Sequence, residues 1–289
     1  MTIKSKHKCP ICFQDTYPIF SHKDLFDNEV ELMKCKNCGH GSYLNMWSQS
    51  HFDEIYGISY AKDYLDFTKT HNQRLEQYVL DVSLLKEYLT ERIKVLDFGC
   101  SSGEYLDAMP NGWDKSGYEV NSKLVKILNS TRPLYSIYEK VSDIKGCFDL
   151  ITLRGVIEHV PEFSILGELI DKQLKVGGIL YISATPDFSS PCAVEYKSDW
   201  CQIVAPEHIH QFTPASLQIL LSTFGLVLKG LYHPYIGTPY ENWEIDSKLY
   251  IENSGRGMSP FVNQNSKAVR SYKHPFPGNM MSAIFEKIV

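Results

Sequence analysis

The stretch Val95–Gly103, V-L-D-F-G-C-S-S-G, decides the fold of this chain. It begins as an apolar strand, carries an acid at Asp97 and then turns through Gly99 and Gly103 into a helical pattern. Such strand-turn-helix joints bind anions or cofactors, because glycine lets the backbone approach a ligand and the helix start presents unpaired N–H groups. The stretch therefore predicts a ligand site where this strand ends.

Short apolar strands alternate with helical patterns of about 10 to 15 residues on both sides of this joint. This alternation predicts an α/β fold with a doubly wound, mostly parallel sheet, whose ligands bind at the carboxyl ends of the strands. The polar residues 240–277 interrupt it and are predicted to form an insertion. Strands are predicted at 95–98, 115–120, 147–153, 179–184, 226–231 and 280–288.

A helix is predicted over Arg74–Leu89, ahead of the first strand. Its apolar residues recur at helical spacing and are expected to face the core. The preceding residues 43–70 are rich in aromatic side chains, which predicts either a packing stripe or a wall of the substrate pocket. The helical positions expected in the core are Leu75, Tyr78, Val79, Val82, Leu85 and Leu89.

Four cysteines near the N-terminus form two C-x-x-C pairs, Cys9 with Cys12 and Cys35 with Cys38. Two such pairs can complete a tetrahedral site of four sulfurs, which suits zinc and leaves no open coordination position. The expected role of the metal is structural, although four unrelated thiols remain the alternative. His40, next to the second pair, is expected at the surface.

Composition limits the possible partners and the location of the protein. The 289 residues carry a net charge of -5, and the chain lacks a basic run interleaved with aromatic residues, which argues against a nucleic-acid partner. No apolar run approaches the roughly 20 residues of a membrane span, and the N-terminus lacks the apolar core of a signal peptide, so a cytoplasmic protein is expected. The predicted division is a zinc-ribbon-like module at 1–45, a helical connector at 46–90 and a cofactor-binding domain at 91–289.

The spacing of the glycine-rich turn favours a particular cofactor. The pattern is D-x-G-x-x-x-G rather than G-x-G-x-x-G, and Glu119 follows Gly103 by 16 residues at the end of the next strand. A carboxylate there can accept a hydrogen bond from each hydroxyl of a ribose. Because the turn contains no lysine or arginine to hold phosphates, the site favours an adenosine cofactor without a pyrophosphate.

The successive motifs of the chain resemble those of class I S-adenosylmethionine-dependent methyltransferases. They are V-L-D-F-G-C-S-S-G-E-Y-L, G-Y-E-V-N, C-F-D-L-I-T-L-R-G-V-I-E-H-V and L-K-V-G-G-I-L-Y-I-S-A-T-P. The later P-E-H-I-H-Q-F-T-P and the paired cysteines are similar to the bacterial branch that methylates sugars and other small molecules and begins with a zinc ribbon. Ser101 departs from the family, which usually has glycine there.

The resemblance implies roles for individual residues. Glu207 and His208 match the Glu-His pair that supplies the base in sugar C-methylating relatives. His159 and His210 compete for that role, and the alternative is that these histidines bond the loop backbone. The cofactor-binding residues implied by position are Asp97, Gly99, Ser101, Gly103, Glu119 and Arg154, with Asp143 for the adenine.

The function expected from these observations is methyl transfer from S-adenosylmethionine to an O or C atom of a small molecule. A sugar nucleotide, a surface-polysaccharide precursor or a secondary metabolite would be the acceptor. Two alternatives remain, an RNA-modifying methyltransferase and a protein that binds the cofactor without catalysis. The sequence specifies neither the acceptor nor the oligomeric state, because a fold does not fix its substrate.

Overall fold

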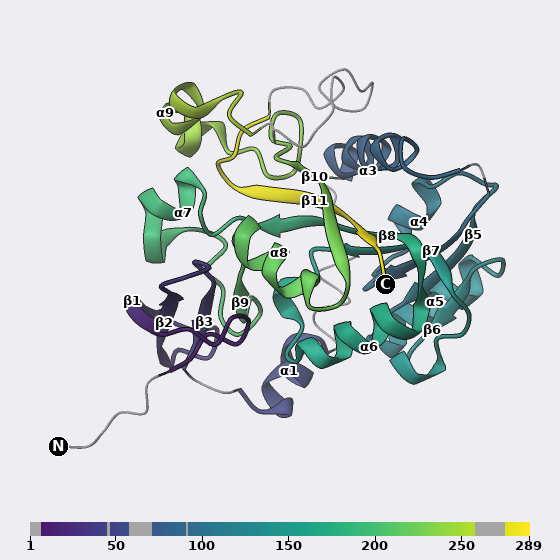
Figure 1. Ribbon diagram of the computed structural model, residues 1–289, viewed down its shortest axis with the longest axis horizontal. Helices are drawn as coiled ribbons and strands as arrows, with labels where there is room; N and C mark the ends of the chain where they lie inside the picture. The colour runs from purple at the N-terminus through teal and green to yellow at the C-terminus, as the bar shows by residue number, and fades with distance from the viewer. Residues whose placement is uncertain (1–6, 45–46, 58–70, 91, 258–274) are drawn as a thin grey trace.

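The computed structural model describes residues 7–44, 47–57, 71–90, 92–257 and 275–289. Two sheets make up the framework, a large one and a small one near the N-terminus (Figure 1). The large sheet comprises β4 (Lys94–Phe98), β5 (Asp114–Tyr118), β6 (Ser136–Tyr138), β7 (Phe148–Arg154), β8 (Leu174–Pro186), β10 (Leu226–Tyr232) and β11 (Met280–Lys287). The helices are α1 (Gln49–Ile55), α3 (His71–Leu85), α4 (Glu104–Ala108), α5 (Ser122–Thr131), α6 (Phe163–Gln173), α7 (Pro191–Tyr196), α8 (Pro214–Ser222) and α9 (Trp243–Asn253).

The strand order of the large sheet is β10-β11-β8-β7-β4-β5-β6. Strands β4 to β8 pair in parallel, whereas β11 runs antiparallel to both β8 and β10. The predicted doubly wound and mostly parallel sheet is therefore confirmed. The largest difference in a strand boundary is at β8, which begins at Leu174 rather than at residue 179. It passes through Gly177, whose φ of 78° only glycine adopts readily.

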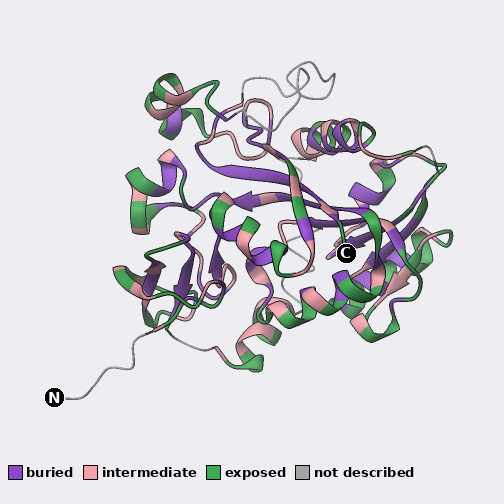
Figure 2. Cartoon of the chain, viewed as in Figure 1, coloured by how far each residue is buried: buried purple, intermediate pink, exposed green. Residues whose placement is uncertain are grey.

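Alternate residues of the buried strands face two separate layers of helices. Leu96, Ile151 and Leu180 pack with α6 and α8, whereas Val95, Leu150 and Tyr181 pack with α3 and α4. Figure 2 shows that the strands between these layers are largely buried. Because both faces are covered, the central strands are largely buried, and mainly their ends remain accessible to polar ligands.

The prediction for the buried face of α3 is partly wrong. Tyr78, Val82 and Leu85 are buried as expected, but Val79 is 62% exposed and Leu75 is also exposed. Their place in the core is taken by Gln77 and by Asp81, which is 0% exposed and accepts a hydrogen bond of 2.9 Å from the Tyr181 hydroxyl. Polar partners inside the protein override the apolar pattern here, because a buried carboxylate is tolerated when it is hydrogen-bonded.

The small sheet has the order β1-β2-β3-β9, with β1 at Thr16–Lys23, β2 at Glu29–Cys35, β3 at Gly41–Tyr43 and β9 at His210–Gln211. All its pairings are antiparallel. Its last strand comes from the loop between β8 and α8, so a segment about 170 positions away in sequence completes the N-terminal sheet. The predicted division into three regions stays a prediction, and this shared sheet ties the first region to the third.

The predicted insertion at 240–277 begins with α9 and precedes β11. Its residues 258–274 lie outside the described part of the chain, as do Tyr60, Tyr64 and Phe67 of the aromatic segment. Among the described residues, no helix is both long and apolar enough to cross a membrane.

Candidate functional site

A cavity of about 270 Å³ lies at the carboxyl ends of the central strands. Phe98, Tyr118 and Arg154, the last residues of β4, β5 and β7, line it, as expected for a sheet of this topology. One end of its wall comes from the glycine-rich turn and the other from the segments around Tyr56 and His159. The cavity thus joins the predicted cofactor residues to one of the predicted catalytic histidines.

The glycine-rich turn follows β4 in a backbone conformation that favours glycine. Gly99, Ser101 and Gly103 have φ angles of 85°, 47° and 78°. A side chain at Gly99 would place its Cβ 2.6 Å from a methyl group of Val156, so close approach also requires glycine there. Ser101 occupies a left-handed position, which explains why the family usually has glycine at this point.

The Ser101 side chain points to a missing partner. Its hydroxyl oxygen is buried without a hydrogen-bond partner among the described residues, and Ser101 lines the cavity. A buried hydroxyl without a partner is costly, so this group fits a ligand that would supply the hydrogen bond. The unpaired Ser101 hydroxyl therefore supports an adenosyl cofactor at this turn, independently of the sequence motif.

Glu119 holds the turn in place from the next strand. Its two carboxylate oxygens accept hydrogen bonds from the backbone N–H groups of Ser101 (2.9 Å) and Asn121 (2.8 Å). The side chain is 5% exposed, lines the cavity, and has a pKa raised by burial. Each oxygen keeps a further lone pair, so the carboxylate can support the turn and still accept hydrogen bonds from a ribose.

Three predicted cofactor residues do not line the cavity: Asp97, Asp143 and Gly103, which is the N-cap of α4. Asp97 lies buried beneath the turn, where it accepts a 2.6 Å hydrogen bond from the Thr152 hydroxyl and where burial raises its pKa to about 6. Asp143 is exposed on a short 3-10 turn after β6, and the neighbouring Val141 faces the cavity instead. Their predicted roles in cofactor binding remain predictions.

Arg154 lies at the floor of the cavity in a buried polar network. Its guanidinium lies 3.5 Å from the Asp81 carboxylate and donates a 3.0 Å hydrogen bond to the Tyr240 hydroxyl. It also stacks over the ring of Tyr78, at 4.6 Å from the ring centroid. This network explains the buried Asp81 and fixes one cationic group at the end of β7.

His159 and His208 lie next to each other, but neither His208 nor Glu207 lines the cavity. Their rings are 4.8 Å apart in an edge-on arrangement, and His159 lines the cavity. The Nδ1 atom of His159 lies 2.7 Å from the carbonyl oxygen of Glu207 and 3.0 Å from the hydroxyl of Tyr56. Burial lowers the pKa of both imidazoles, that of His159 to about 3, so both are neutral near pH 7.

Glu158 belongs to the same cluster and was missed by the sequence analysis. It is 2% exposed, accepts a 3.2 Å hydrogen bond from the Thr185 hydroxyl, and has a pKa raised by burial to about 8. Glu207 is only half-buried, and burial raises its pKa too. The adjacency of Glu158 to His159 in the V-I-E-H motif was the available signal, and Tyr56 was indicated only by the aromatic segment.

His210 does not join this cluster. It pairs with His40, whose Nε2 lies 3.2 Å from the Nδ1 of His210, between the small sheet and the large domain. The expectation that His40 lies at the surface is wrong, because it is 0% exposed. Since β9 pairs with β3, it carries His210 to His40, which lies two residues after Cys38.

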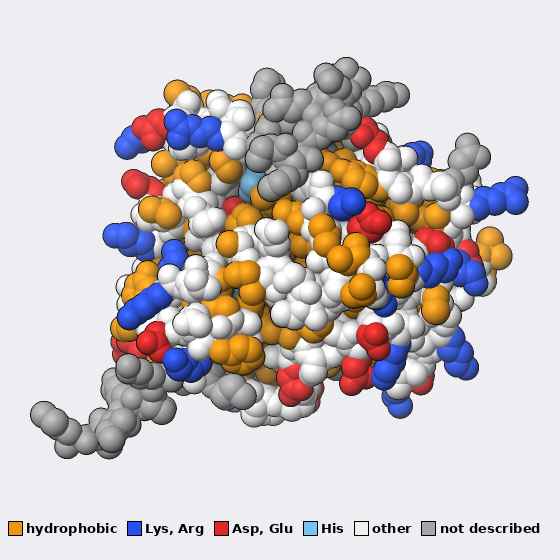
Figure 3. Space-filling view, in the orientation of Figure 1, with side chains coloured by type: hydrophobic (Ala, Val, Ile, Leu, Met, Phe, Trp, Pro, Cys, Tyr) orange, Lys and Arg blue, Asp and Glu red, His pale blue; other side chains and the backbone are white. Residues whose placement is uncertain are grey.

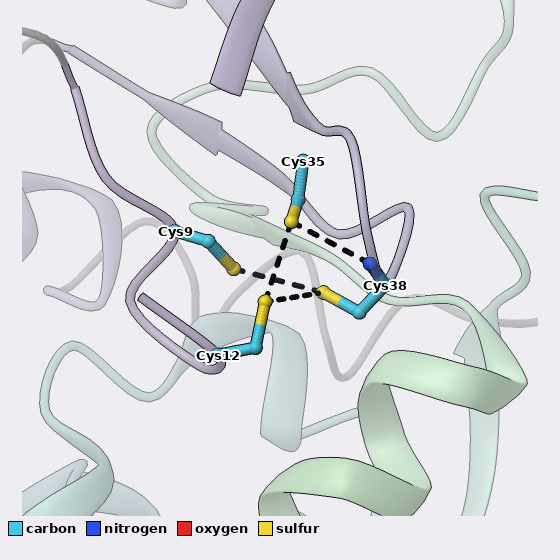
Figure 4. Close-up of side chains that lie close together, drawn as sticks. All are labelled: Cys9, Cys12, Cys35 and Cys38. Atoms are coloured by element: carbon cyan, nitrogen blue, oxygen red, sulfur yellow. Dashed lines mark hydrogen bonds between the residues drawn. The ribbon is translucent and has the colours of Figure 1, made fainter. Parts of the chain in front are cut away.

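The four predicted metal-binding cysteines come together (Figure 4). Their sulfurs lie 3.6 Å (Cys9–Cys38), 3.4 Å (Cys12–Cys35) and 3.6 Å (Cys12–Cys38) apart. Zinc–sulfur bonds of about 2.3 Å in a tetrahedron would separate sulfurs by about 3.8 Å. The backbone N–H groups of Ile11 and Asn37 also point at cysteine sulfurs. The cluster therefore fits a structural zinc site of a zinc ribbon.

Comparison with known proteins agrees with this geometry. A model of the methyltransferase domain family matches residues 67–229. The ubiquinone biosynthesis O-methyltransferase of Xanthomonas euvesicatoria pv. vesicatoria is 26% identical over 183 residues, which cover 56% of this chain and 75% of that protein.

Solved structures show the same fold at low identity. The plantazolicin methyltransferase BpumL, in complex with a triazolic desmethylPZN analog and SAH, has a TM-score of 0.54 and 16% identity over 83% of this chain and 93% of its own. The 1,6-didemethyltoxoflavin-N1-methyltransferase of Burkholderia thailandensis has a TM-score of 0.50 and 12% identity, and covers 94% of this chain and 100% of its own. The chain belongs to the methyltransferase domain family and is a class I S-adenosylmethionine-dependent methyltransferase.

Proposed function

We propose that this enzyme methylates an oxygen or carbon atom of a small-molecule acceptor in the cavity that runs from Glu119 to His159. The observation that carries the proposal is this single cavity, because its wall includes both the cofactor turn and one of the clustered histidines. The O-methyltransferase name of the Xanthomonas relatives supports oxygen as the methylated atom.

S-adenosylmethionine supplies a methyl group that its sulfonium already activates. The protein then has to hold the two reactants in line and accept a proton from the acceptor. The cofactor would be held by Gly99, Ser101 and Glu119. Asp97 and Gly103 would support the glycine-rich turn without lining the cavity. Phe52 and Tyr56 of the connector would cover the acceptor, since both line the cavity.

The residues proposed for the proton transfer are His208, Glu207 and His159. His208 donates its Nδ1 hydrogen to the carbonyl oxygen of Gln202 at 2.9 Å, which leaves its Nε2 lone pair available as a base. Glu207 is the more exposed of the two neighbouring carboxylates, so it can pass a proton to solvent. A nucleic-acid substrate has less support, because Figure 3 shows acidic and basic side chains intermixed on the face in view rather than a basic surface.

Calorimetry with S-adenosylhomocysteine tests the cofactor half of the proposal. The wild-type protein is expected to bind one equivalent, Glu119→Ala to lose binding, and His208→Ala to keep it. Turnover is then measured as S-adenosylhomocysteine release with a panel of quinols, catechols and sugar nucleotides. His208→Ala should abolish release with the true acceptor. Absence of cofactor binding by folded, zinc-loaded protein would refute the proposal.

A further inference from the structure

Three potential metal ligands converge beside the acceptor end of the cavity. Glu158 and His159 lie on the 3-10 turn after β7, and His208 lies on the loop before β9. One ligand atom from each lies within 4.8 Å of the other two. None of the three belongs to the four-cysteine cluster, which the same geometry identifies separately.

The hydrogen bonds of the two imidazoles leave one nitrogen of each ring free to bind a cation. The Nδ1 atoms of His159 and His208 each bond a backbone carbonyl oxygen, of Glu207 at 2.7 Å and of Gln202 at 2.9 Å. A carbonyl only accepts, so each Nδ1 carries the hydrogen and each Nε2 keeps its lone pair. Bonds of this kind fix the tautomer and orientation of histidines that ligate metals.

Glu158 supplies the carboxyl group of the cluster. Its Oε2 atom accepts from Thr185, whereas Oε1 faces the Nε2 of His159 across 3.9 Å, too far for a hydrogen bond. Among the residues that the structure describes, no lysine or arginine pairs with Glu158 or with the nearby Glu207. A carboxyl group and two imidazoles thus lie together with no lysine or arginine paired to them among the described residues, and this donor set suits a divalent cation.

We propose that Glu158, His159 and His208 bind one divalent first-row cation, which recognises an acceptor with two adjacent oxygen atoms. Two imidazoles and a carboxylate suit such a cation and leave coordination positions open. Ligands of one ion lie about 3 to 3.5 Å apart, so the three side chains would close by about 1 Å. The class of acceptor rests on the proposed function, and includes vicinal diols, catechols and hydroxy ketones.

The ion would act on the acceptor as a Lewis acid. It would lower the pKa of a coordinated hydroxyl. Because His159 and His208 would then be ligands of the ion rather than bases, the proton would pass to Glu207 or to water. The resulting oxygen anion forms the new bond to the methyl carbon, while the bond between that carbon and the sulfonium sulfur breaks and its electron pair stays on sulfur. The methylated acceptor and S-adenosylhomocysteine leave, and no oxidant or reductant is required.

Manganese(II) chloride is the probe for the test. Its binding to the zinc-loaded protein is detected by electron paramagnetic resonance. Mn²⁺ stands lowest in the first-row affinity series, so it leaves zinc on the four thiolates. We expect one Mn²⁺ bound by the wild type, and a loss of affinity of about 10-fold or more in Glu158→Gln and in His208→Gln. His71→Gln is the matched control, because His71 lies 3.6 Å from the Glu104 carboxylate, away from the proposed site, and its loss should change nothing.

Calorimetry with S-adenosylhomocysteine on the same samples separates the two proposals. Binding by all four proteins shows that the variants are folded and that the cofactor half works. If the wild type binds S-adenosylhomocysteine but takes up no Mn²⁺ at millimolar concentration, or if all variants bind Mn²⁺ equally, the cation site is refuted. If S-adenosylhomocysteine does not bind, the proposed function fails, whatever the Mn²⁺ result.

Discussion

The cofactor half and the acceptor half of the cavity are built in different ways. The cofactor half comes from one continuous stretch, Val95 to Asn121, in which two neighbouring parallel strands and a turn are joined by backbone N–H groups. The acceptor half combines Tyr56, the turn at Ile157–His159 and the loop around His208. The first is therefore a local structure and the second a product of tertiary packing.

The acceptor half also depends on the N-terminal module. His208 lies two residues before β9, and β9 is the last strand of the small sheet through its pairing with Gly41 and Ser42. The Thr213 hydroxyl, just beyond β9, donates a 2.8 Å hydrogen bond to the carbonyl oxygen of Cys38. Zinc at the cysteines would thus order the loop that carries His208. Among the described residues, no hydrogen bond joins the cofactor turn to the four-cysteine module.

The largest expected effect follows from removing a zinc ligand. Cys35→Ser should lose the equivalent of zinc and unfold the small sheet, because structural zinc contributes about 10 kcal/mol or more to folding of small domains. Turnover and Mn²⁺ binding at Glu158, His159 and His208 should fall with it. S-adenosylhomocysteine affinity should stay within about twofold, as for distant independent sites. Metal analysis measures the zinc content, hydrogen exchange measures the unfolding of the small sheet, and calorimetry measures the S-adenosylhomocysteine affinity.

Cys147→Ser is the control, because Cys147 is an exposed free cysteine outside the cluster. The Cys147→Ser variant should retain zinc, turnover and Mn²⁺ binding. If Cys35→Ser loses S-adenosylhomocysteine binding as strongly as turnover, the two halves are one cooperative unit and the comparison is wrong.

The next effect is expected at Gly99 in the cofactor half. Gly99→Ala imposes a left-handed φ on alanine and places its Cβ 2.6 Å from Val156, so we expect a loss of unfolding free energy of about 2 to 4 kcal/mol. Gly146→Ala shares the positive φ but meets nothing within 4 Å, so it should lose only about 1 kcal/mol. Urea unfolding measures both. Equal losses would show that the contact with Val156 relaxes freely.

The same contrast explains what the sequence could predict. The turn, Glu119 and the mostly parallel sheet follow from local patterns, because a strand, a glycine turn and the next strand already define that half. The cluster of His159 and His208 could not be derived, because it depends on where β9 pairs, and a two-residue strand leaves no pattern. The burial of Asp81 was missed for a similar reason, since its partners Tyr181 and Arg154 come from other strands.

A smaller effect concerns the buried aspartate beneath the cofactor turn. Burial raises the pKa of Asp97 to about 6, so the native state binds its proton more tightly than the unfolded state does. The resulting stabilisation is fully present below about pH 4 and is lost as the pH rises through 6, by roughly 2 to 3 kcal/mol. Asp97→Asn should remove this loss, so that its unfolding free energy, measured from pH 4 to 8, gains on the wild type as the pH rises.

Asp149→Asn provides a control of opposite sign. Burial alone would raise the pKa of Asp149, but hydrogen bonds from Lys175 and from the backbone of Lys94 outweigh it and lower the pKa. The stabilisation by Asp149 is present at neutral pH and is lost on acidification. The free energy of unfolding of the variant should therefore be lower than that of the wild type at pH 7 and equal to it in acid. A flat difference between Asp97→Asn and the wild type would mean that water reaches the base of the turn.

The smallest effect is expected from one hydroxyl group in the acceptor half. The Tyr56 hydroxyl lies 3.0 Å from the Nδ1 of His159, which the Glu207 carbonyl also bonds at 2.7 Å. Tyr56→Phe keeps the ring that lines the cavity and removes only this contact, which is worth about 1 kcal/mol. Turnover with the true acceptor should therefore fall about fivefold while S-adenosylhomocysteine affinity stays unchanged. Tyr135→Phe is the matched control, because its hydroxyl bonds Asp107 away from the cavity and should affect neither quantity. A fall in cofactor affinity instead of turnover would place Tyr56 in the cofactor half and contradict the division of the cavity.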